Sequence, residues 1–352
     1  MKKIYQDSTF YLVIFIVSYF IYVYPYEILN QLIFNENASR NSSLYYTLLI
    51  GALVILYFRS KITFFPLKIF IYEGMGIGFI SFWVLNIAYI ISYFNLLTNY
   101  FVGIFSLLII ILLTIISLLM ANFIKLKKIN IKSNKISKNY NFFLITDIHL
   151  GTNSINHLNK ILKKIDKYKY DFILIGGDLL DSSNFDLNKL TVLKKIKKPI
   201  YFVTGNHEFY IFYYQNKINN LQKFNIKVLN NTSNIIDDLN IIGIDDNIDN
   251  NNKISNINKL INKSKYNLSL VHKPSIWDNV KQNIDLMLCG HTHNGQIFPF
   301  NFFVRLQFKY KYGLYNSNFS NLYVSSGSGC WGPRMRLGTF NEIVYFNLNK
   351  YI

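Results

Sequence analysis

Five polar clusters follow five short apolar runs in the second half of this 352-residue chain, and they hold residue types that bind metal ions. In order they are Thr146-Asp147-Ile148-His149, Gly176-Gly177-Asp178-Leu179-Leu180-Asp181, Gly205-Asn206-His207-Glu208, His272-Lys273-Pro274 and Gly290-His291-Thr292-His293. Each apolar run is typical of a buried strand that ends in a turn. One such cluster is often only a turn or a helix cap. Five clusters that contain five of the six histidines favour one shared site at the carboxyl ends of strands.

The donor set indicates the class of metal. The two cysteines, Cys289 and Cys330, lack the spacing of a zinc knuckle, and we expect Cys289 to be buried. Carboxylate, amide and imidazole donors suit Mn, Fe or Zn. There are more donors than one ion needs, which favours two divalent ions able to clamp an in-line phosphoryl displacement. Asp178, in the middle of the set after a glycine, is the predicted bridging ligand.

The elements that must position these side chains alternate between strand and helix. Predicted strands are 142–145, 172–175, 200–203, 241–244, 268–271, 286–288, 322–324 and 343–346, with helices at 155–168 and 187–196. This order predicts an α/β domain over residues 141–352, with two mixed sheets packed as a sandwich and flanked by helices.

The first half of the chain has the composition of a membrane region. Residues 1–124 predict four spans, at about 9–26, 41–58, 69–94 and 100–124, because about 20 apolar residues cross a bilayer. Residues 125–140 are rich in Lys, Asn and Ser and predict a basic juxtamembrane linker. The glycines within 74–78 predict close helix packing, and Glu73 beside them predicts an interfacial carboxylate.

Charge predicts the orientation and the partners. The chain has a net charge of +18. Lysines or arginines lie before span one, between spans two and three, and after span four. The positive-inside rule therefore places the α/β domain on the cytoplasmic side of the cell membrane. A basic domain there could bind anionic lipid. The basic residues are scattered rather than clustered with aromatic ones, so nucleic acid is not an expected partner, and no obligate protein partner is inferred.

In this order, D-x-H, G-D-x-x-D, G-N-H-E, H-x-P and G-H-x-H, the motifs resemble those of the calcineurin-like metallophosphoesterases. The segment Gly329–Gly338 is similar to the bacterial membrane-associated phosphodiesterase branch. The resemblance implies one ion held by Asp147, His149, Asp178 and His293, and another by Asp178, Asn206, His272 and His291. It also implies that His207 is not a ligand but contacts phosphate and protonates the leaving oxygen. Asn294 departs from the glycine usual in this branch, and four spans replace a shorter anchor.

Several residues have two interpretations. Asp181 could orient a ligand histidine or cap a helix, and Glu208 could act in the same way. Arg334 and Arg336 could bind a substrate phosphate or form ion pairs that pack a loop. His157 is expected to be a plain surface residue.

The favoured hypothesis is a membrane-anchored phosphohydrolase that cleaves a phosphodiester or pyrophosphate bond by attack of metal-bound hydroxide. Four spans and a basic domain favour a lipid-linked phosphate as substrate. A soluble nucleotide or generic phosphoester is the alternative within the same chemistry. A non-catalytic metal-binding scaffold is the alternative from another class, and the complete ligand set argues against it. A transporter or sensor with an appended hydrolase is a third hypothesis, which the scarcity of charge inside the spans disfavours.

Overall fold

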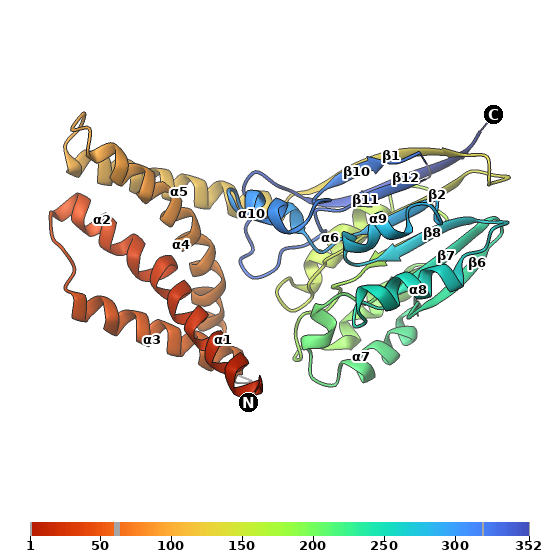
Figure 1. Cartoon of the computed structure of the whole chain (residues 1–352), viewed down its shortest axis with the longest axis horizontal. Helices are drawn as coiled ribbons and strands as arrows, with labels where there is room; N and C mark the ends of the chain where they lie inside the picture. The colour runs from red at the N-terminus through yellow and green to blue at the C-terminus, as the bar shows by residue number, and fades with distance from the viewer. Residues whose placement is uncertain (1, 60–63, 319, 352) are drawn as a thin grey trace. The chain divides into compact units, whose positions relative to one another are not determined.

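The computed structural model describes residues 2–59, 64–318 and 320–351, and the chain forms two compact units (Figure 1). The first unit comprises Met1–Leu119 and the short segment Gly332–Met335. The second comprises Met120–Trp331 and Arg336–Ile352. The first unit is built from helices, and the second contains both β-sheets.

The helical unit contains α1 (Lys2–Ser18), a π-helical turn η1 (Tyr19–Val23), α2 (Tyr24–Phe34), α3 (Arg40–Arg59), α4 (Phe65–Ser92) and α5 (Asn99–Asn122). Among the described residues, four helical stretches are long and apolar enough to cross a membrane: Thr9–Phe34, Arg40–Arg59, Phe65–Ser92 and Asn99–Asn122. The first continues beyond the predicted end at Tyr26 because Glu27 is accommodated inside the helix. Its carboxylate accepts hydrogen bonds from the hydroxyls of Tyr19 and Ser43.

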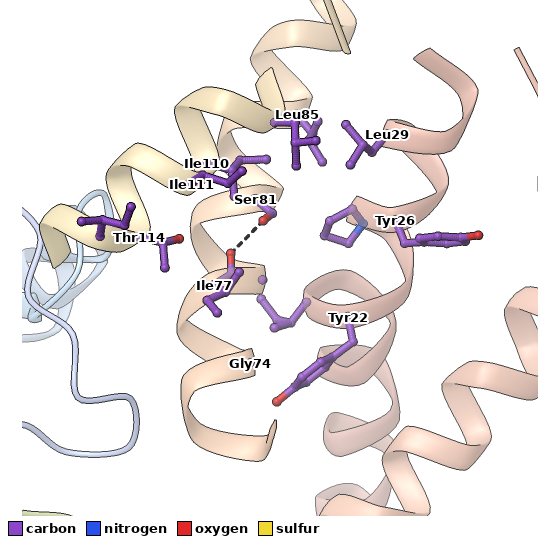
Figure 2. Close-up of a pocket in the computed structure, with 15 residues that line it drawn as sticks. Tyr22, Tyr26, Leu29, Gly74, Ile77, Ser81, Leu85, Ile110, Ile111 and Thr114 are labelled. Carbon is purple, nitrogen blue, oxygen red and sulfur yellow. Dashed lines mark hydrogen bonds between the residues drawn. The ribbon is translucent and has the colours of Figure 1, made fainter. Parts of the chain in front are cut away.

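Glycines bring the helices of this unit into close contact, as predicted for the glycine run. A Cβ atom at Gly78 would lie only 2.0 Å from the carbonyl oxygen of Ile21, and one at Gly74 would lie 2.9 Å from the ring of Tyr22. An open pocket of about 490 Å³ lies between α4, α5 and the stretch formed by η1 and α2 (Figure 2). Its lining is apolar apart from a few hydroxyls, and that of Ser81 donates to the carbonyl of Ile77 at 2.8 Å.

The second unit contains two six-stranded sheets. The first has the order β1-β12-β2-β3-β4-β5, and the second has the order β10-β11-β9-β8-β7-β6. The strands are β1 (Ile124–Ser133), β2 (Tyr140–Ile145), β3 (Phe172–Gly176), β4 (Ile200–Val203), β5 (Ile226–Val228), β6 (Thr232–Ile236), β7 (Leu239–Ile244), β8 (Tyr266–Val271), β9 (Leu286–Cys289), β10 (Gly313–Asn316), β11 (Asn321–Val324) and β12 (Asn341–Lys350). Both sheets mix parallel and antiparallel pairs, which confirms the predicted fold class.

Alternate residues of each central strand face opposite layers. Phe142 and Leu144 of β2 belong to the core between the sheets, whereas Phe143 and Ile145 face the outer layer. Phe142 stacks between Phe172 and Phe346, with ring centroids 4.9 and 5.0 Å apart. Both faces of the sheet are buried, so its strands appear in the sequence as continuous apolar runs rather than as alternating ones.

Helices cover the outer face of each sheet. Residues of α6 (Ile155–Ile165) and the 3₁₀ helix η2 (Leu187–Lys195) pack on the first sheet, and those of α8 (Asn250–Leu260) and α9 (Trp277–Val280) pack on the second. The remaining helical elements are η3 (His207–Tyr210), α7 (Tyr214–Asn220), η4 (Leu221–Phe224), η5 (Pro274–Ile276), η6 (His293–Gly295) and α10 (Phe300–Gln307). Cys289 is buried, as expected.

The predicted linker is wrong for most of its length. Residues 124–133 form β1, which pairs in parallel with β12 at the edge of the first sheet. The lysines of this segment give it the composition of a linker, but Ile124, Ile129 and Ile131 are buried in the strand. Strands β5, β6 and β10 were not predicted either, since they are short or half-exposed.

Candidate metal centre

The topology brings the five polar clusters to one edge of the sandwich. Strands β2, β3 and β4 are parallel neighbours in the first sheet, and β8 and β9 are parallel neighbours in the second. Because the carboxyl ends of parallel strands meet at the same edge, the turns after them lie together. Short distances connect all seven predicted ligand residues into one cluster, described in two groups below.

The first group contains Asp147, His149 and His293, whose donor atoms lie within 4.8 Å of one another. The Nε2 atoms of His149 and His293 are 3.1 Å apart, and Nε2 of His293 lies 3.6 Å from Oδ1 of Asp147. All three residues are buried or nearly so. Burial, together with the charges of His149 and Arg336, lowers the pKa of His293 well below its usual value, so its ring is neutral.

The second group contains His272 and His291, with Asn206 beside them. Nε2 of His272 lies 3.2 Å from Nδ1 of His291 and 3.2 Å from Oδ1 of Asn206. Burial and the charge of His272 lower the pKa of His291 to about 3. Neutral imidazoles have the free lone pair that a metal ion requires.

Asp178 joins the two groups. Its Oδ2 atom lies 3.7 Å from Nε2 of His149 in the first group and 3.2 Å from Nε2 of His272 in the second. Its Oδ1 atom accepts a hydrogen bond from the backbone N–H of His207 at 2.9 Å. Burial would raise the pKa of Asp178, but His272 holds it well below its usual value, so the group is a carboxylate.

The surroundings of His272 fit a cation. Its Nδ1 atom lies 2.9 Å from the carbonyl oxygen of Gly176, which can only accept, so Nδ1 carries the ring proton. Nε2 then has a lone pair, yet it faces two acceptors, the carboxylate of Asp178 and the amide oxygen of Asn206. A second proton, on Nε2, would give these acceptors a donor. Asp178 accordingly raises the pKa of His272, although burial alone would lower it. A divalent cation would satisfy these acceptors equally and would satisfy the other donors too.

The backbone is strained where the donors are attached. Asp147, His149, Asp178, His291 and His293 all have φ between 48° and 73°, the left-handed region that L-residues rarely occupy. Such strain costs about 1–3 kcal/mol per residue and concentrates at functional sites. Glycine is also required nearby, since a Cβ atom at Gly205 would lie 2.2 Å from Oδ1 of Asp178.

Two buried carboxylates support this arrangement. Oδ2 of Asp181 lies 3.4 Å from Nδ1 of His149, and its Oδ1 accepts from the backbone N–H of Thr152 at 2.9 Å. Glu208 differs from the prediction because it contacts backbone rather than a histidine. Its carboxylate accepts from the N–H groups of Asp178, Leu180 and Gly205 at 2.8–3.0 Å, and so ties together the turns after β3 and β4.

Arg336 lies elsewhere than predicted for a substrate-binding residue. It is fully buried, and its guanidinium donates to the carbonyl oxygens of His293, Ser326 and Gly329 at 2.7–2.8 Å. A further N–H donates to Oδ1 of Asn341 at 3.0 Å. These protein acceptors occupy its donors, so Arg336 holds the turn that carries His293 instead of facing a phosphate.

Arg334 belongs to the helical unit, where its Nε atom donates to Oε1 of Glu73 at 2.8 Å. About half of its side chain is exposed. This ion pair corresponds to the loop-packing interpretation of Arg334, and it gives Glu73 a specific partner.

His207 lies at the rim of the centre between aromatic rings. Its ring centroid is 4.7 Å from that of His149, 5.3 Å from Tyr210 and 5.5 Å from Trp331. With His149 and Asp178 it also forms a group of donors within 4.8 Å. Burial lowers the pKa of His207 to about 4. The sequence analysis assigned no role to Tyr210 or to Trp331, although Trp331 lies in the segment Gly329–Gly338 that carries part of the resemblance.

His157 is buried, which corrects the expectation of a surface residue. Its Nε2 atom lies 2.6 Å from the carbonyl oxygen of Ser328, so the ring fastens α6 to the loop after β11. Asn153 was also missed. Its side-chain amide donates to the carbonyls of Ile148 and Cys330 at 2.9 and 2.8 Å and links the turn after β2 to the same loop.

Comparison with known proteins indicates the family of this domain. Residues 140–295 match the model of the calcineurin-like phosphoesterase family. The chain carries a calcineurin-like phosphoesterase domain. The family consists of phosphoric ester hydrolases that use divalent metal ions.

Three relatives illustrate the similarity. An uncharacterized metallophosphoesterase of Campylobacter jejuni is 34% identical over 239 residues, covering 64% of this chain and 63% of that protein. One of Helicobacter pylori is 34% identical over 236 residues, covering 64% of each protein. A transmembrane protein with metallophosphoesterase domain from Danio rerio is 28% identical over 251 residues, covering 64% of this chain and 57% of that protein. The aligned part thus spans less than two thirds of each relative.

Proposed function

We propose that the chain is a membrane-anchored phosphohydrolase with two divalent metal ions, which cleaves a phosphodiester or pyrophosphate bond. One observation carries the proposal: a single oxygen of Asp178, Oδ2, lies within reach of both groups, 3.7 Å from Nε2 of His149 and 3.2 Å from Nε2 of His272. A carboxylate in that position can be shared by two ions.

Asp147, His149, Asp178 and His293 would hold one ion, and Asp178, Asn206, His272 and His291 the other. Mn, Fe and Zn all accept such ligands. When bound, the ions supply Lewis-acid stabilisation of the phosphoryl oxygens and lower the pKa of water. The protein fixes the donors in advance through strained turns and through the hydrogen bonds of Glu208 and Arg336.

His207 is the residue proposed to act on the leaving group. Its ring lies at the rim rather than inside either group of donors, and it is only partly buried. A phosphate anion beside it would raise its pKa by stabilising the imidazolium form. The ring could then donate a proton to the leaving oxygen, a contribution typically of about 10²–10⁴-fold in rate.

The four apolar helices support anchoring in the cell membrane, and the positive-inside rule supports a cytoplasmic domain. A substrate in the same membrane is then the favoured class, in the form of a lipid-linked phosphate. A tag after Ile352 should accordingly be accessible from the cytoplasm, and a tag found outside the cell would contradict this orientation.

The test uses the full-length protein in detergent with added Mn²⁺. Bis(p-nitrophenyl) phosphate, p-nitrophenyl phosphate and a lipid pyrophosphate are offered in parallel, with and without a chelator. We expect hydrolysis of the diester or the pyrophosphate, abolished by the chelator and restored by metal. No hydrolysis of any substrate with Mn²⁺, Fe²⁺ or Zn²⁺ would refute the enzymatic function.

A further inference from the structure

The short helix α10 (Phe300–Gln307) has its apolar face on the outside. None of its residues is buried, and Leu306, Phe302 and Phe303 are 85%, 59% and 45% exposed. Positions 302, 303 and 306 lie on one face of a helix, since side chains three or four residues apart are neighbours. Asn301 and Val304 are half-buried on the opposite face. A solvated surface helix normally shows the reverse pattern.

The inner side of α10 is attached to the phosphoesterase domain, so the direction of its apolar face is fixed. A Cβ atom at Gly295 would lie 2.3 Å from Cα of Asn301, which shows how closely the turn η6 approaches the helix. Nζ of Lys311 donates to the carbonyl of Asn301 at 3.3 Å. The backbone N–H of Phe298 donates to the carbonyl of Leu337 at 2.9 Å.

The segment before α10 is hydrogen-bonded to the part of the domain that contains the last turn of α5. The last turn of α5, Met120–Asn122, belongs to the second unit, and only Phe123 separates α5 from β1. The side-chain amide of Asn341 donates to the carbonyl of Ala121 at 2.6 Å. Two residues before Asn341, the hydroxyl of Thr339 donates to the carbonyl of Gln296 at 2.6 Å, just ahead of α10. These two hydrogen bonds connect the last turn of α5, which ends a candidate span, through residues 339–341 to the segment just before α10.

A lipid surface fits this face better than a second protein does. One connecting residue spans at most about 3.6 Å, so where α5 leaves a membrane the domain must stand on its surface. Arg305 is exposed on α10 and makes no ion pair among the described residues, unlike Lys309, which pairs with Asp278 at 2.8 Å. The chain as a whole is strongly basic, whereas the cytoplasmic leaflet is anionic.

We propose that the apolar face of α10 inserts into the headgroup region of an anionic bilayer, with Phe302, Phe303 and Leu306 in the acyl boundary and Arg305 at the lipid phosphates. Only four residues separate His293 from Phe298 at the base of this segment. The inserted helix would thus hold the metal centre at a fixed height above the lipid surface. The proposal rests on the spans crossing a membrane and is independent of the reaction.

The test places a nitroxide label at position 306 of the full chain, as Leu306→Cys, in vesicles of phosphatidylethanolamine and phosphatidylglycerol. Accessibility of the label to oxygen and to a water-soluble nickel chelate is read from spin relaxation. The matched control is Ile235→Cys, another exposed apolar residue (56%), on the edge strand β6. The two native cysteines are buried, so the unsubstituted chain serves as the background for labelling.

We expect the label at 306 to be accessible to oxygen and shielded from nickel, with the opposite at 235. An aqueous signature at both positions would overturn the proposal. So would a label at 306 that is immobile and shielded from both reagents, because protein would then cover the face. Arg305→Gln, or replacement of the anionic lipid by phosphatidylcholine, should lower the ratio of immersed to solvent-exposed label by about fivefold or more. An unchanged fraction would refute the contact of Arg305 with lipid phosphate.

Discussion

The two halves of the metal centre are held by different kinds of partner. In the His149 half (Asp147, His149 and His293), side chains orient the rings: Asp181 lies 3.4 Å from Nδ1 of His149, and Arg336 holds the backbone of His293. In the His272 half (Asn206, His272 and His291), backbone orients the ring of His272, because its Nδ1 faces the carbonyl of Gly176 at the end of β3.

This difference predicts which substitutions act on which ion. A side-chain partner can be removed by mutation, whereas the carbonyl of Gly176 is fixed by a strand in the middle of the sheet. The His149 half should therefore be the more easily loosened one. Asp178, which faces both halves, is the residue whose loss should affect both equally.

The largest effect is expected for Asp178→Asn. An amide keeps the shape but removes the charge shared between the halves, so both ions should be lost. Activity should fall by about 10³-fold or more, since the ions supply several kcal/mol of transition-state stabilisation. Metal content per chain and kcat/KM measure this. Asp278→Asn, at a surface pair with Lys281 and Lys309, is the control and should retain both ions. Two ions in Asp178→Asn would refute the bridging role.

His207→Ala should separate chemistry from metal binding. We expect kcat to fall by about 10²–10⁴-fold, while both ions remain. The loss should be smaller for a substrate whose leaving group needs no proton, such as p-nitrophenolate. Because the ring lies close to His149 and Asp178, loss of one ion in this variant would mean that His207 is itself a ligand.

Asp181→Asn and Arg336→Lys should each lower the affinity for only one of the two ions. Partners of ligand histidines typically contribute about 10–100-fold to metal affinity. We expect that loss for the ion of the His149 half, with the other affinity unchanged, in a metal titration of the full-length chain. Arg336→Lys keeps the charge but removes the planar guanidinium, so lysine cannot donate to the same three carbonyl oxygens. Equal weakening of both ions would remove the distinction between the halves.

The smallest effect is expected for Asn294→Gly. Asn294 has φ 52° and ψ 25°, a left-handed conformation that asparagine tolerates better than most residues. Glycine there should change stability by no more than about 0.5–1 kcal/mol and leave metal content unchanged. Thermal unfolding and kcat/KM on diester and lipid substrates check this. A large change confined to the lipid substrate would show that Asn294 contributes to substrate choice.

The sequence indicates where most of the candidate donors lie, because they follow recognisable strands. Asp147 and His149 follow an apolar run directly, and parallel pairing of neighbouring strands then brings such ends together. Hydrogen bonds between residues far apart in the sequence could not be predicted in this way. The sequence left two interpretations open for Arg336, because nothing local indicates that its guanidinium donates to the carbonyl of His293, 43 residues earlier.

The same limit explains the errors in the fold. The lysines of β1 are consistent with a solvated linker, and only pairing with β12 at the other end of the domain sequence makes the segment a strand. His157 looked like a surface residue because its acceptor, Ser328, lies 171 positions away. Helix α10 was not predicted from the sequence, and the exposure of its apolar face depends on the fold around it.

The central claim is that two ions share Asp178. Electron paramagnetic resonance of the full-length chain loaded with two equivalents of Mn²⁺ tests it most directly, because ions about 3.5–4 Å apart couple magnetically. We predict the signal of a spin-coupled pair, which Asp178→Asn abolishes. A spectrum of isolated Mn²⁺ ions at full loading, unaffected by Asp178→Asn, would contradict the account.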